Sequence, residues 1–300
     1  MLGETLAVLC ALSWAISVVL FKKAELSADV SPQSLNLFKN MMALPLLLVT
    51  MAVMGEQFQW GRSMADWLGL AASGVIGIAV GDTLYFAALR RLGPGMLAIV
   101  ETSFSPAVVV FSILLLDEVI GLSFLGGAAL ILGGVVIATL GDMRGAKDGD
   151  GPSISLPGVT VGIAAAVMVA FGFVIAKPAL SRSGLVEGTT VRLVFGVIAQ
   201  LLWILPRRSR GEVLWILKPH PVWRPLLPGA FIGSYVAMLL WLGGLKYTDA
   251  SIAALLNQLT VVFTIAMGVV ALGERLTRGR MIGAAAALCG AILIVLTGGA

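Results

Sequence analysis

The feature of this sequence that most constrains its fold is an internal repeat. When the chain is shifted by 156 positions, residues 77–138 align with residues 233–294 without a gap. Identical residues then coincide along the alignment, among them Gly77 with Gly233, Leu84 with Leu240, Leu89 with Leu245, Leu116 with Leu272, Glu118 with Glu274 and Gly134 with Gly290. A repeat of this length indicates that one structural unit is built twice.

Composition shows that each copy is a membrane unit. Hydrophobic residues make up 59% of the chain, charged residues 12%, and the mean hydropathy is +1.01. A soluble domain carries roughly 25% charged residues. Cutting at the short polar breaks gives ten apolar segments of about the length that spans a bilayer. They are Glu4–Phe21, Gln33–Met54, Trp67–Leu89, Pro94–Leu116, Leu122–Leu140, Leu156–Ala176, Glu187–Leu205, Trp223–Leu245, Ala250–Leu272 and Gly279–Thr297.

Five spans per copy require the second copy to enter the bilayer upside down, because five is odd. We therefore expect an all-α integral membrane protein with ten transmembrane helices arranged as two inverted five-helix repeats. Residues 1–140 form the first repeat, 141–155 a surface linker rich in Gly, Asp and Lys, and 156–300 the second repeat. Inverted repeats are typical of secondary transporters, which bind substrate between the copies near the midplane.

Several classes of function are excluded by what the sequence lacks. Cys10 and Cys289 both lie in apolar spans, which argues against a disulfide framework or a cysteine metal site. His220, the only histidine, lies between two prolines in a loop, so no metal or histidine-based enzyme site is expected. No phosphate-binding P-loop motif occurs, so ATP does not drive this chain. We expect no enzyme activity, no cofactor and no nucleic-acid partner. The amino terminus is acidic and does not resemble a cleaved signal.

The distribution of basic residues predicts an orientation. One side holds 14 of the 20 Lys and Arg residues, namely Lys22, Lys23, Arg90, Arg91, Arg144, Lys147, Arg207, Arg208, Arg210, Lys218, Arg224, Arg275, Arg278 and Arg280. The other side holds Arg62, Lys177, Arg182 and Lys246. The positive-inside rule then places both termini outside the cytoplasm. The segment 207–224, with Trp215 and Trp223, would lie at the cytoplasmic interface, either as a membrane-surface stretch or as a basic loop that only fixes topology.

Several short motifs, repeated in order, resemble the EamA branch of the drug/metabolite transporter superfamily. They are Trp14 with Lys22 and Lys23, the run 87–92 (AALRRL), Pro106, the run 116–118 (LDE), Gly126 with Gly127, the run 244–247 (GLKY) and the run 272–276 (LGERL). The second copy departs from the pattern, because Val262 stands where Pro106 would fall. The resemblance implies ten helices in inverted repeats, with cytoplasmic termini, which is opposite to the charge count. It also implies export of amino acids, other small metabolites or drugs, while related branches carry sugar phosphates and nucleotide sugars.

Four ionisable residues lie well inside the predicted spans: Lys39, Asp82, Glu101 and Arg192. A charge near the bilayer centre costs about 2.5–3.5 kcal/mol, so such residues face protein or water and are candidates for function. Helical rise places Lys39, Asp82 and Glu101 at a shared depth of about 10 Å from one membrane face. They are predicted to line one cavity, with Glu101 and Asp82 as proton-coupling candidates. The alternative is that Lys39 only neutralises a carboxylate as a structural pair.

The second copy carries different chemistry at the equivalent positions. Asn257 replaces Glu101, Gln258 adds a second amide, and Arg192 corresponds approximately to Lys39. Amides hydrogen-bond a substrate without titrating. One copy can therefore exchange protons, whereas the other can only bind.

Aromatic residues and a proline complete the predicted cavity. Trp14, Tyr85 and Trp241 lie inside spans, and Tyr85 is equivalent to Trp241 in the repeat. They form either the walls of a substrate cavity or filling between helices. Pro106 is predicted to bend the fourth helix and free a backbone carbonyl near Thr102, or simply to kink the helix.

Small residues recur every four positions on three of the predicted helices. The stripes are Gly69, Ser73, Gly77 and Gly81; Gly229 and Gly233; and Gly279 and Gly283. This spacing puts small residues on one helical face, where backbones approach closely in lipid. The stripes serve either static packing or the sliding of one bundle against the other.

These observations predict a secondary active exporter of small polar or amphipathic metabolites, such as amino acids or drug-like compounds. We expect it in the bacterial inner membrane, as a monomer or weak homodimer in the lipid bilayer, working by proton exchange and alternating access. A passive facilitator or channel and an exchanger of the sugar-phosphate or nucleotide-sugar type are the alternatives.

Overall fold

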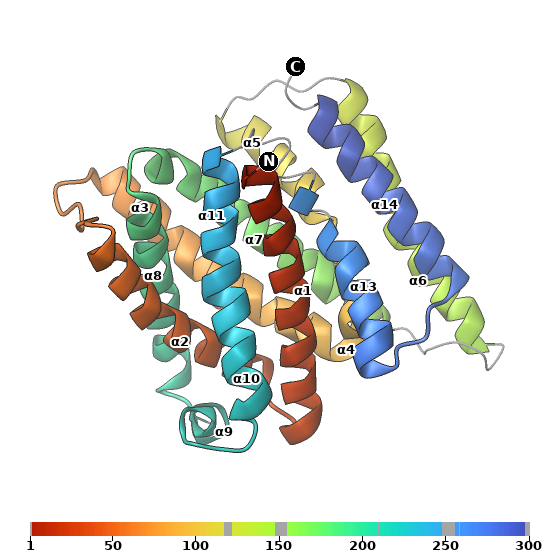
Figure 1. Ribbon diagram of the computed structural model, residues 1–300, viewed down its shortest axis with the longest axis horizontal. Coiled ribbons are helices and arrows are strands. Elements are labelled where there is room, and N and C mark those ends of the chain that lie inside the picture. Colours follow the sequence, from red (N-terminus) through yellow and green to blue (C-terminus); the bar gives the residue numbers. More distant parts are fainter. Residues whose placement is uncertain are drawn as a thin grey trace.

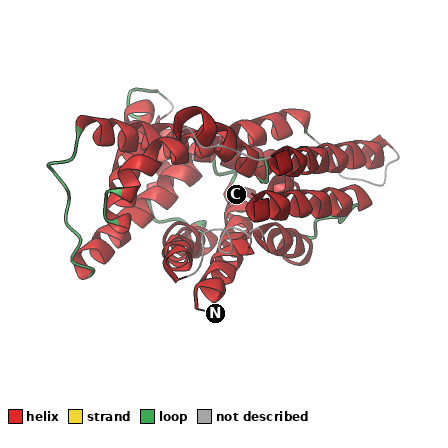
Figure 2. Ribbon diagram, turned by 90° about the horizontal axis from the view of Figure 1, so that it is seen from above, coloured by secondary structure: helices red, strands yellow, loops and turns green. Residues whose placement is uncertain are grey.

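The computed structural model describes residues 2–116, 122–147, 155–208, 210–247, 256–257 and 259–297. Within these ranges every regular element is a helix, and no strand occurs (Figure 2). Helices of the two copies are interleaved in one bundle, with α6 and α14 side by side along one flank (Figure 1). The chain is thus an all-α membrane-type fold, as the sequence predicts.

The elements follow the predicted segments closely. The first copy contains α1 (Leu2–Ala28), α2 (Pro32–Val53), α3 (Met64–Ser73), η1 (Gly74–Gly81), α4 (Asp82–Glu101), α5 (Phe104–Leu116) and α6 (Leu122–Lys147). The second contains α7 (Leu156–Ser181), α8 (Leu185–Ile204), α9 (Arg210–Leu214), η2 (Trp215–Leu217), α10 (Trp223–Ala230), η3 (Phe231–Val236), α11 (Ala237–Tyr247), α13 (Leu259–Leu272) and α14 (Arg278–Thr297).

Five helical stretches in the described chain are long and apolar enough to cross a membrane. They are Leu2–Ala28, Pro32–Val53, Met64–Glu101, Leu156–Ser181 and Val186–Ile204. Shorter apolar helices cover Pro106–Leu116, Leu125–Gly141 and Leu259–Leu272. The stretch that ends at Glu101 contains the third predicted span and the start of the fourth, and the chain bends between them at Gly93. Gly93 has φ 73° and ψ 166°, a conformation that glycine adopts without a steric penalty.

Serine residues start three of the long helices. Ser31, Ser63 and Ser155 each accept a hydrogen bond from a backbone N–H three residues later, at the starts of α2, α3 and α7. Such caps satisfy an N–H group that has no partner within the helix. Proline in the first turn of α2 and α7 removes a further unpaired N–H.

A π-helix interrupts the third predicted span of the first copy and its equivalent in the second. η1 occupies Gly74–Gly81, and η3 occupies Phe231–Val236. Shifting η1 by 156 positions gives residues 230–237, which enclose η3. A π-turn adds a residue to the helical turn and leaves backbone groups to be satisfied by other partners. The repetition shows that both copies encode the same local distortion.

The small-residue stripes lie at close helix contacts. A Cβ atom built on Gly81 would come 2.7 Å from Val169 of α7, and one built on Gly69 would come 3.0 Å from the Ile175 carbonyl oxygen. Gly233 faces Ser17 of α1. In the pair α6 and α14, a Cβ on Gly279 would lie 2.7 Å from the Gly141 Cα atom. The stripes therefore lie where neighbouring helices pack closely, with backbone against backbone at Gly69 and Gly279 and against side chains at Gly229 and Gly233.

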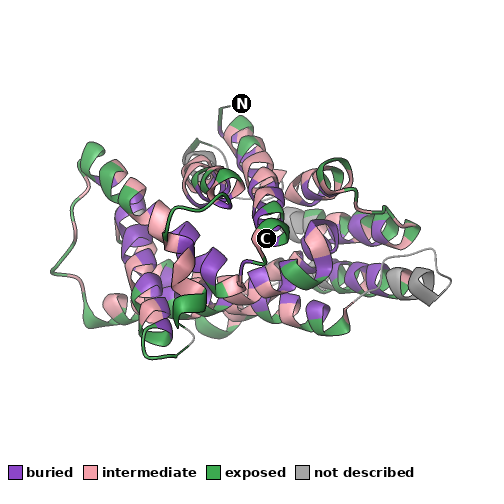
Figure 3. Ribbon diagram, turned by 90° about the horizontal axis from the view of Figure 1, so that it is seen from below, coloured by how far each residue is buried: buried purple, intermediate pink, exposed green. Residues whose placement is uncertain are grey.

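Large apolar side chains are exposed around the outside of the bundle, as bilayer contact requires. Val53, Leu202 and Val270 are 81%, 68% and 86% exposed. Buried positions lie mainly on the sides of the helices that face one another (Figure 3). An exposed apolar surface of this extent is unusual for a soluble monomer and fits a protein surrounded by lipid.

Several predicted boundaries differ from the structure. α1 continues to Ala28, past the predicted end at Phe21. α6 continues to Lys147, so the first part of the predicted linker at 141–155 is helical. The fourth predicted span is divided at Thr102 and Ser103, between α4 and α5. Pro106 therefore lies in the first turn of α5, where a missing N–H costs little, and not in the middle of a helix.

We expect Gly172→Ala to destabilise the protein much more than Gly77→Ala, although the two glycines face each other. A Cβ on Gly172 would lie 2.9 Å from both the N and Cα atoms of Gly77, whereas a Cβ on Gly77 would lie 3.6 Å from the Gly172 Cα atom. Overpacking of this kind costs about 1–3 kcal/mol. Thermal unfolding of the two purified variants in detergent checks the difference. Equal melting temperatures would contradict the close contact of η1 with α7.

The charge count predicts that Gly211 faces the cytoplasm and Gly61 the opposite side. Both positions are exposed, and a Cβ at either meets no atom within 4 Å, so each accepts a cysteine. Figure 1 shows α9 at the opposite end of the bundle from the start of α1. In a Cys289→Ala background, an impermeant thiol reagent added to intact cells should label Gly61→Cys and not Gly211→Cys. The reverse pattern would place the termini in the cytoplasm.

Candidate functional site

An ion pair lies between α2 and α4. Lys39 Nζ donates to Asp82 Oδ2 at 2.7 Å, and the two side chains are 9% and 24% exposed. Asp82 follows η1 directly, so the end of the π-helix sets its position. Lys39 also donates to Asn40 Oδ1 at 3.0 Å. Of the two predicted carboxylates, Asp82 and Glu101, the structure thus pairs Asp82 with Lys39.

Amide side chains extend this ion pair into a chain of hydrogen bonds. Asn40 Nδ2 donates to Asn36 Oδ1 at 3.0 Å on α2 and to Gln200 Oε1 at 3.3 Å on α8. All three amide residues are buried. The network therefore links the ion pair of the first copy to a helix of the second. Buried polar networks restrict the arrangement of the helices around them.

Asn36 also satisfies the backbone of the π-helix. Its Nδ2 donates to the Ile78 carbonyl oxygen at 2.8 Å and to Thr83 Oγ1 at 2.9 Å. Thr83 Oγ1 in turn donates to the Ala79 carbonyl oxygen at 2.7 Å. Carbonyl groups in η1 thus find side-chain partners inside the protein, which is the condition for irregular backbone at membrane depth.

Glu101 ends α4 and is not part of the ion pair. Its side chain is half-buried, and among the described residues no cation lies within 4.0 Å of it. Asp82 and Tyr85 lie within electrostatic range of Glu101. The site therefore holds two neighbouring carboxyl groups, of which only Asp82 has a cationic partner in the described chain.

Two of the three predicted aromatic residues are in contact. The rings of Trp14 on α1 and Tyr85 on α4 are 6.1 Å apart and tilted by 51°. Tyr85 also contacts Phe86 edge to face at 5.6 Å. Trp241 on α11 is partly buried and makes no ring contact with Trp14 or Tyr85 in the part of the chain described. Aromatic surface thus lies next to the carboxyl groups on the side of α1.

Arg192 occupies a separate place on α8. Its Nε donates to Ser73 Oγ at 2.7 Å, and its guanidinium lies 6.0 Å from the centre of the Phe173 ring. Asp82 is within electrostatic range of Arg192 but forms no ion pair with it among the described contacts. Arg192 is therefore anchored to the small-residue stripe of α3, beside the ion pair rather than within it.

The remaining predicted residues, Asn257, Gln258 and Pro106, have no described contact with the Lys39–Asp82 ion pair. Asn257 is partly buried, and its backbone carbonyl accepts a hydrogen bond from Thr260 Oγ1 at 2.7 Å. Gln258 lies outside the described residues. Pro106 follows the break at Thr102, whose Oγ1 donates to the Ile99 carbonyl oxygen at 2.6 Å. That bond satisfies one carbonyl at the end of α4.

Sequence reasoning missed the amides and a second buried ion pair. Asn36 and Asn40 lie three residues before and one residue after Lys39 in an apolar segment. Uncharged amides next to a charged residue within a span are the signal that could have identified them. Arg62 Nη2 donates to Glu187 Oε2 at 2.6 Å, with both side chains at most 3% exposed. Glu187 begins α8, so this pair joins the α2–α3 connection of the first copy to the second copy. Nothing in the sequence indicates that these two loop-end residues meet.

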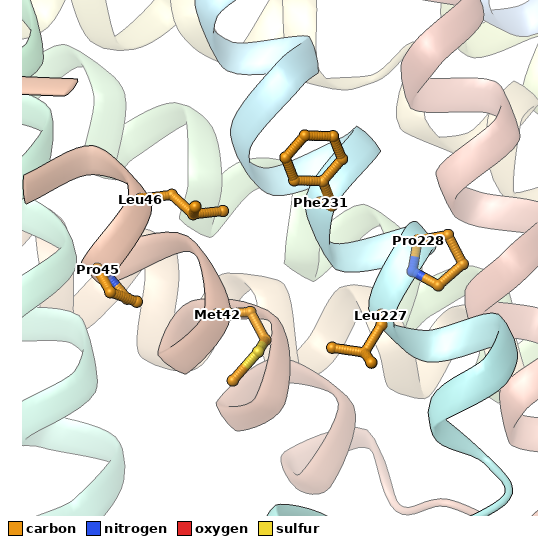
Figure 4. A pocket seen from close by; sticks show the side chains of 6 residues that line it. All are labelled: Met42, Pro45, Leu46, Leu227, Pro228 and Phe231. Carbon is orange, nitrogen blue, oxygen red and sulfur yellow. The ribbon is translucent and has the colours of Figure 1, made fainter. Parts of the chain in front are cut away.

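A cavity of about 420 Å³ opens between α2 and the segment formed by α10 and η3 (Figure 4). It is lined by Met42, Pro45, Leu46, Leu227, Pro228 and Phe231. The lining is apolar, and Phe231 is 48% exposed. Met42 lies one turn beyond Lys39 on α2, so the cavity borders the ion pair without sharing its polar groups. No group of three or more His, Cys, Asp or Glu residues in the described ranges could hold a metal ion.

A helical membrane bundle with a polar network between its helices defines the general class of a membrane transporter, and comparison with known proteins agrees. The sequence model of the EamA-like transporter family matches residues 1–140 and 156–296, once for each copy. The chain belongs to this family, whose members are membrane transporters of the drug/metabolite transporter superfamily. A solved structure titled "Crystal structure of protein" has a TM-score of 0.65 and 20% sequence identity, covering 98% of this chain and 96% of that one. That likeness shows the fold. No curated protein matches the sequence significantly.

We expect Asp82→Asn and Lys39→Met each to lower stability substantially, and the double variant to recover part of the loss. Removing one partner leaves the other charge buried without compensation, which costs about 3–5 kcal/mol, whereas removing both avoids that penalty. Thermal unfolding of the three purified variants measures the coupling between the residues. Strictly additive losses would show that the two charges do not stabilise each other.

Proposed function

We propose that the protein is a secondary active exporter of small polar or amphipathic metabolites, driven by proton exchange. It would reside in the bacterial inner membrane as a monomer or weak homodimer. The family assignment supports transport of a small molecule across a lipid bilayer. The coupling ion, the direction and the membrane are our proposals, as is the inverted arrangement of ten helices.

The observation that carries the proposal is the unequal pairing of two neighbouring carboxyl groups. Lys39 holds a charge-assisted hydrogen bond to Asp82, whereas Glu101 has no cation within reach in the described chain. An ionised Glu101 would therefore add an uncompensated negative charge to a half-buried site. Uptake of one proton, or arrival of a cationic substrate group, removes that charge.

The chemistry of coupling follows from this competition. A carboxyl group surrounded by protein favours its neutral form, and contact with water favours its ionised form. If the site opens in turn to the two sides, Glu101 takes up a proton on one side and releases it on the other. Substrate and proton then compete for the same carboxyl group, Glu101. Such competition is the condition for exchanging one against the other. Asp82 differs from Glu101 in having the Lys39 ammonium group beside it, at 2.7 Å.

The second copy supports the same division of roles. Asn257 replaces the titratable Glu101 by an amide at the equivalent position, and the adjacent Gln258 adds a second amide. Such groups donate and accept hydrogen bonds without changing charge. Trp14 and Tyr85 supply apolar surface beside the carboxyl groups for an amphipathic substrate. The Arg192 guanidinium lies near enough to interact with an anionic substrate group after a small rearrangement.

Glu101→Gln should abolish accumulation of substrate against a gradient while preserving substrate binding. Glutamine keeps the size and hydrogen-bonding capacity of glutamate but cannot exchange a proton. Reconstituted proteoliposomes with an imposed pH gradient measure accumulation, and substrate-for-substrate exchange measures the remaining activity. Asp29→Asn, which changes a carboxyl group with a side chain 79% exposed, serves as the control and should behave as wild type.

Concentration of substrate by a stable Glu101→Gln protein, with unchanged dependence on pH, would rule out this residue as the coupling group. Asp82 would then be the next candidate. Wild-type protein that only equilibrates substrate, whatever the proton gradient, would instead indicate a passive facilitator.

A further inference from the structure

A second cavity, whose lining includes neither Lys39 nor Asp82, lies where the start of α2 meets the end of α8 and α9. It measures about 180 Å³ and is lined by Ser31, Gln33, Trp203, Ile204, Arg207, Arg210, Glu212 and Val213. Ser31 caps α2 and Gln33 lies in its first turn. Trp203 and Ile204 end α8, Arg207 lies between α8 and α9, and the remaining three residues belong to α9. Figure 1 shows this region at the end of the bundle opposite the start of α1.

Three charged side chains line this cavity without neutralising one another. Arg207, Arg210 and Glu212 all border the cavity, yet no ion pair within 4.0 Å joins them among the described residues. Arg207 instead lies over the Trp203 ring at 3.9 Å, and Arg210 Nη1 donates to the Leu205 carbonyl oxygen at 3.4 Å. Opposite charges held apart around one space leave room for a ligand that brings both a negative and a positive group.

We propose that this cavity binds the headgroup of an amino-phospholipid of the phosphatidylethanolamine type. The phosphate would lie between Arg207 and Arg210, since guanidinium groups match phosphate oxygens in geometry and charge. The ammonium would lie at Glu212. A purely anionic headgroup leaves Glu212 without a cation, and a quaternary ammonium cannot donate a hydrogen bond to it.

The surface next to the cavity identifies the ligand as a lipid rather than a soluble phosphate ester. Ile198, Leu202 and Leu205 on α8 are 44%, 68% and 45% exposed, and Trp203 is 61% exposed. Their spacing places an apolar stripe along α8 that leads to the cavity. Acyl chains can follow this stripe while the headgroup stays at the membrane surface, where Trp and Arg are typical.

The site joins the two copies of the repeat. Ser34 Oγ of α2 donates to the Val213 carbonyl oxygen at 3.2 Å, so α9 already contacts the first copy here. A headgroup bound between the α1–α2 connection and α9 would add contacts across the same junction. Ligand that binds only the folded arrangement raises its apparent stability.

The test is thermal unfolding of the purified full chain in detergent micelles that contain one added lipid. We expect phosphatidylethanolamine to raise the melting temperature more than phosphatidylcholine or phosphatidylglycerol. The double variant Arg207→Gln/Arg210→Gln should lose this rise, and Glu212→Gln should lose the preference for phosphatidylethanolamine over phosphatidylcholine. Arg208→Gln is the matched control, because Arg208 is an exposed arginine of the same segment that does not line the cavity.

Native mass spectrometry of the same proteins counts the lipid molecules that each protein retains. It thus measures lipid binding directly for any variant whose melting temperature is already lowered by poor folding. An equal rise with all three lipids would overturn the proposal, as would a rise that survives in the double arginine variant or disappears in Arg208→Gln. Water-soluble glycerophosphoethanolamine carries the same headgroup without acyl chains. It therefore tests whether the ligand is a membrane lipid or a soluble phosphate ester. A rise as large as that with the lipid would assign the cavity to a soluble ligand and overturn the membrane assignment.

Discussion

The hydrocarbon interior of a membrane cannot hydrogen-bond to a backbone, and this constraint accounts for most of the architecture. Each long helix satisfies most of its own backbone groups, and side chains inside the bundle satisfy carbonyl groups of the π-helix η1. In η1 the carbonyl groups of Ile78 and Ala79 accept hydrogen bonds from Asn36 and Thr83. The same Asn36 bonds to Asn40, which contacts Lys39. The distortion of the helix and the charged site are thus parts of one hydrogen-bonded network.

Close approach of backbones is the second property on which the site depends. Glycine at 77 and 172 lets η1 lie against α7, and Gly74 and Gly196 allow the same helix to approach α8. Larger residues would move η1 away from its neighbours and with it Asp82, which begins the next turn. A substitution far from any charge can therefore disturb the ion pair.

The two copies share a fold but divide the chemistry. Each copy has a π-helix in the equivalent span and a glycine stripe on an equivalent helix. The first copy supplies Lys39, Asp82 and Glu101, whereas the second supplies Arg192 and amides. Contacts between the copies occur at several depths, through Gln200 and through the buried pair of Arg62 with Glu187. The repeat thus gives the shared frame, and differences between the copies place the two carboxyl groups in the first copy.

The sequence by itself determined the class of fold, the approximate extents of most helices, and four of the charged residues that lie within them, Lys39, Asp82, Glu101 and Arg192. Apolar length and the 156-residue period are local or periodic properties, so they can be read along the chain. Partner choice is different, because it depends on which faces of distant helices meet. Only the tertiary structure decided that Lys39 pairs with Asp82 and not with Glu101, that Arg192 bonds to Ser73, and that Glu187 receives Arg62. Helical rise fixed the depth of these groups but not their rotation about the helix axes, and rotation is set by packing against neighbouring helices.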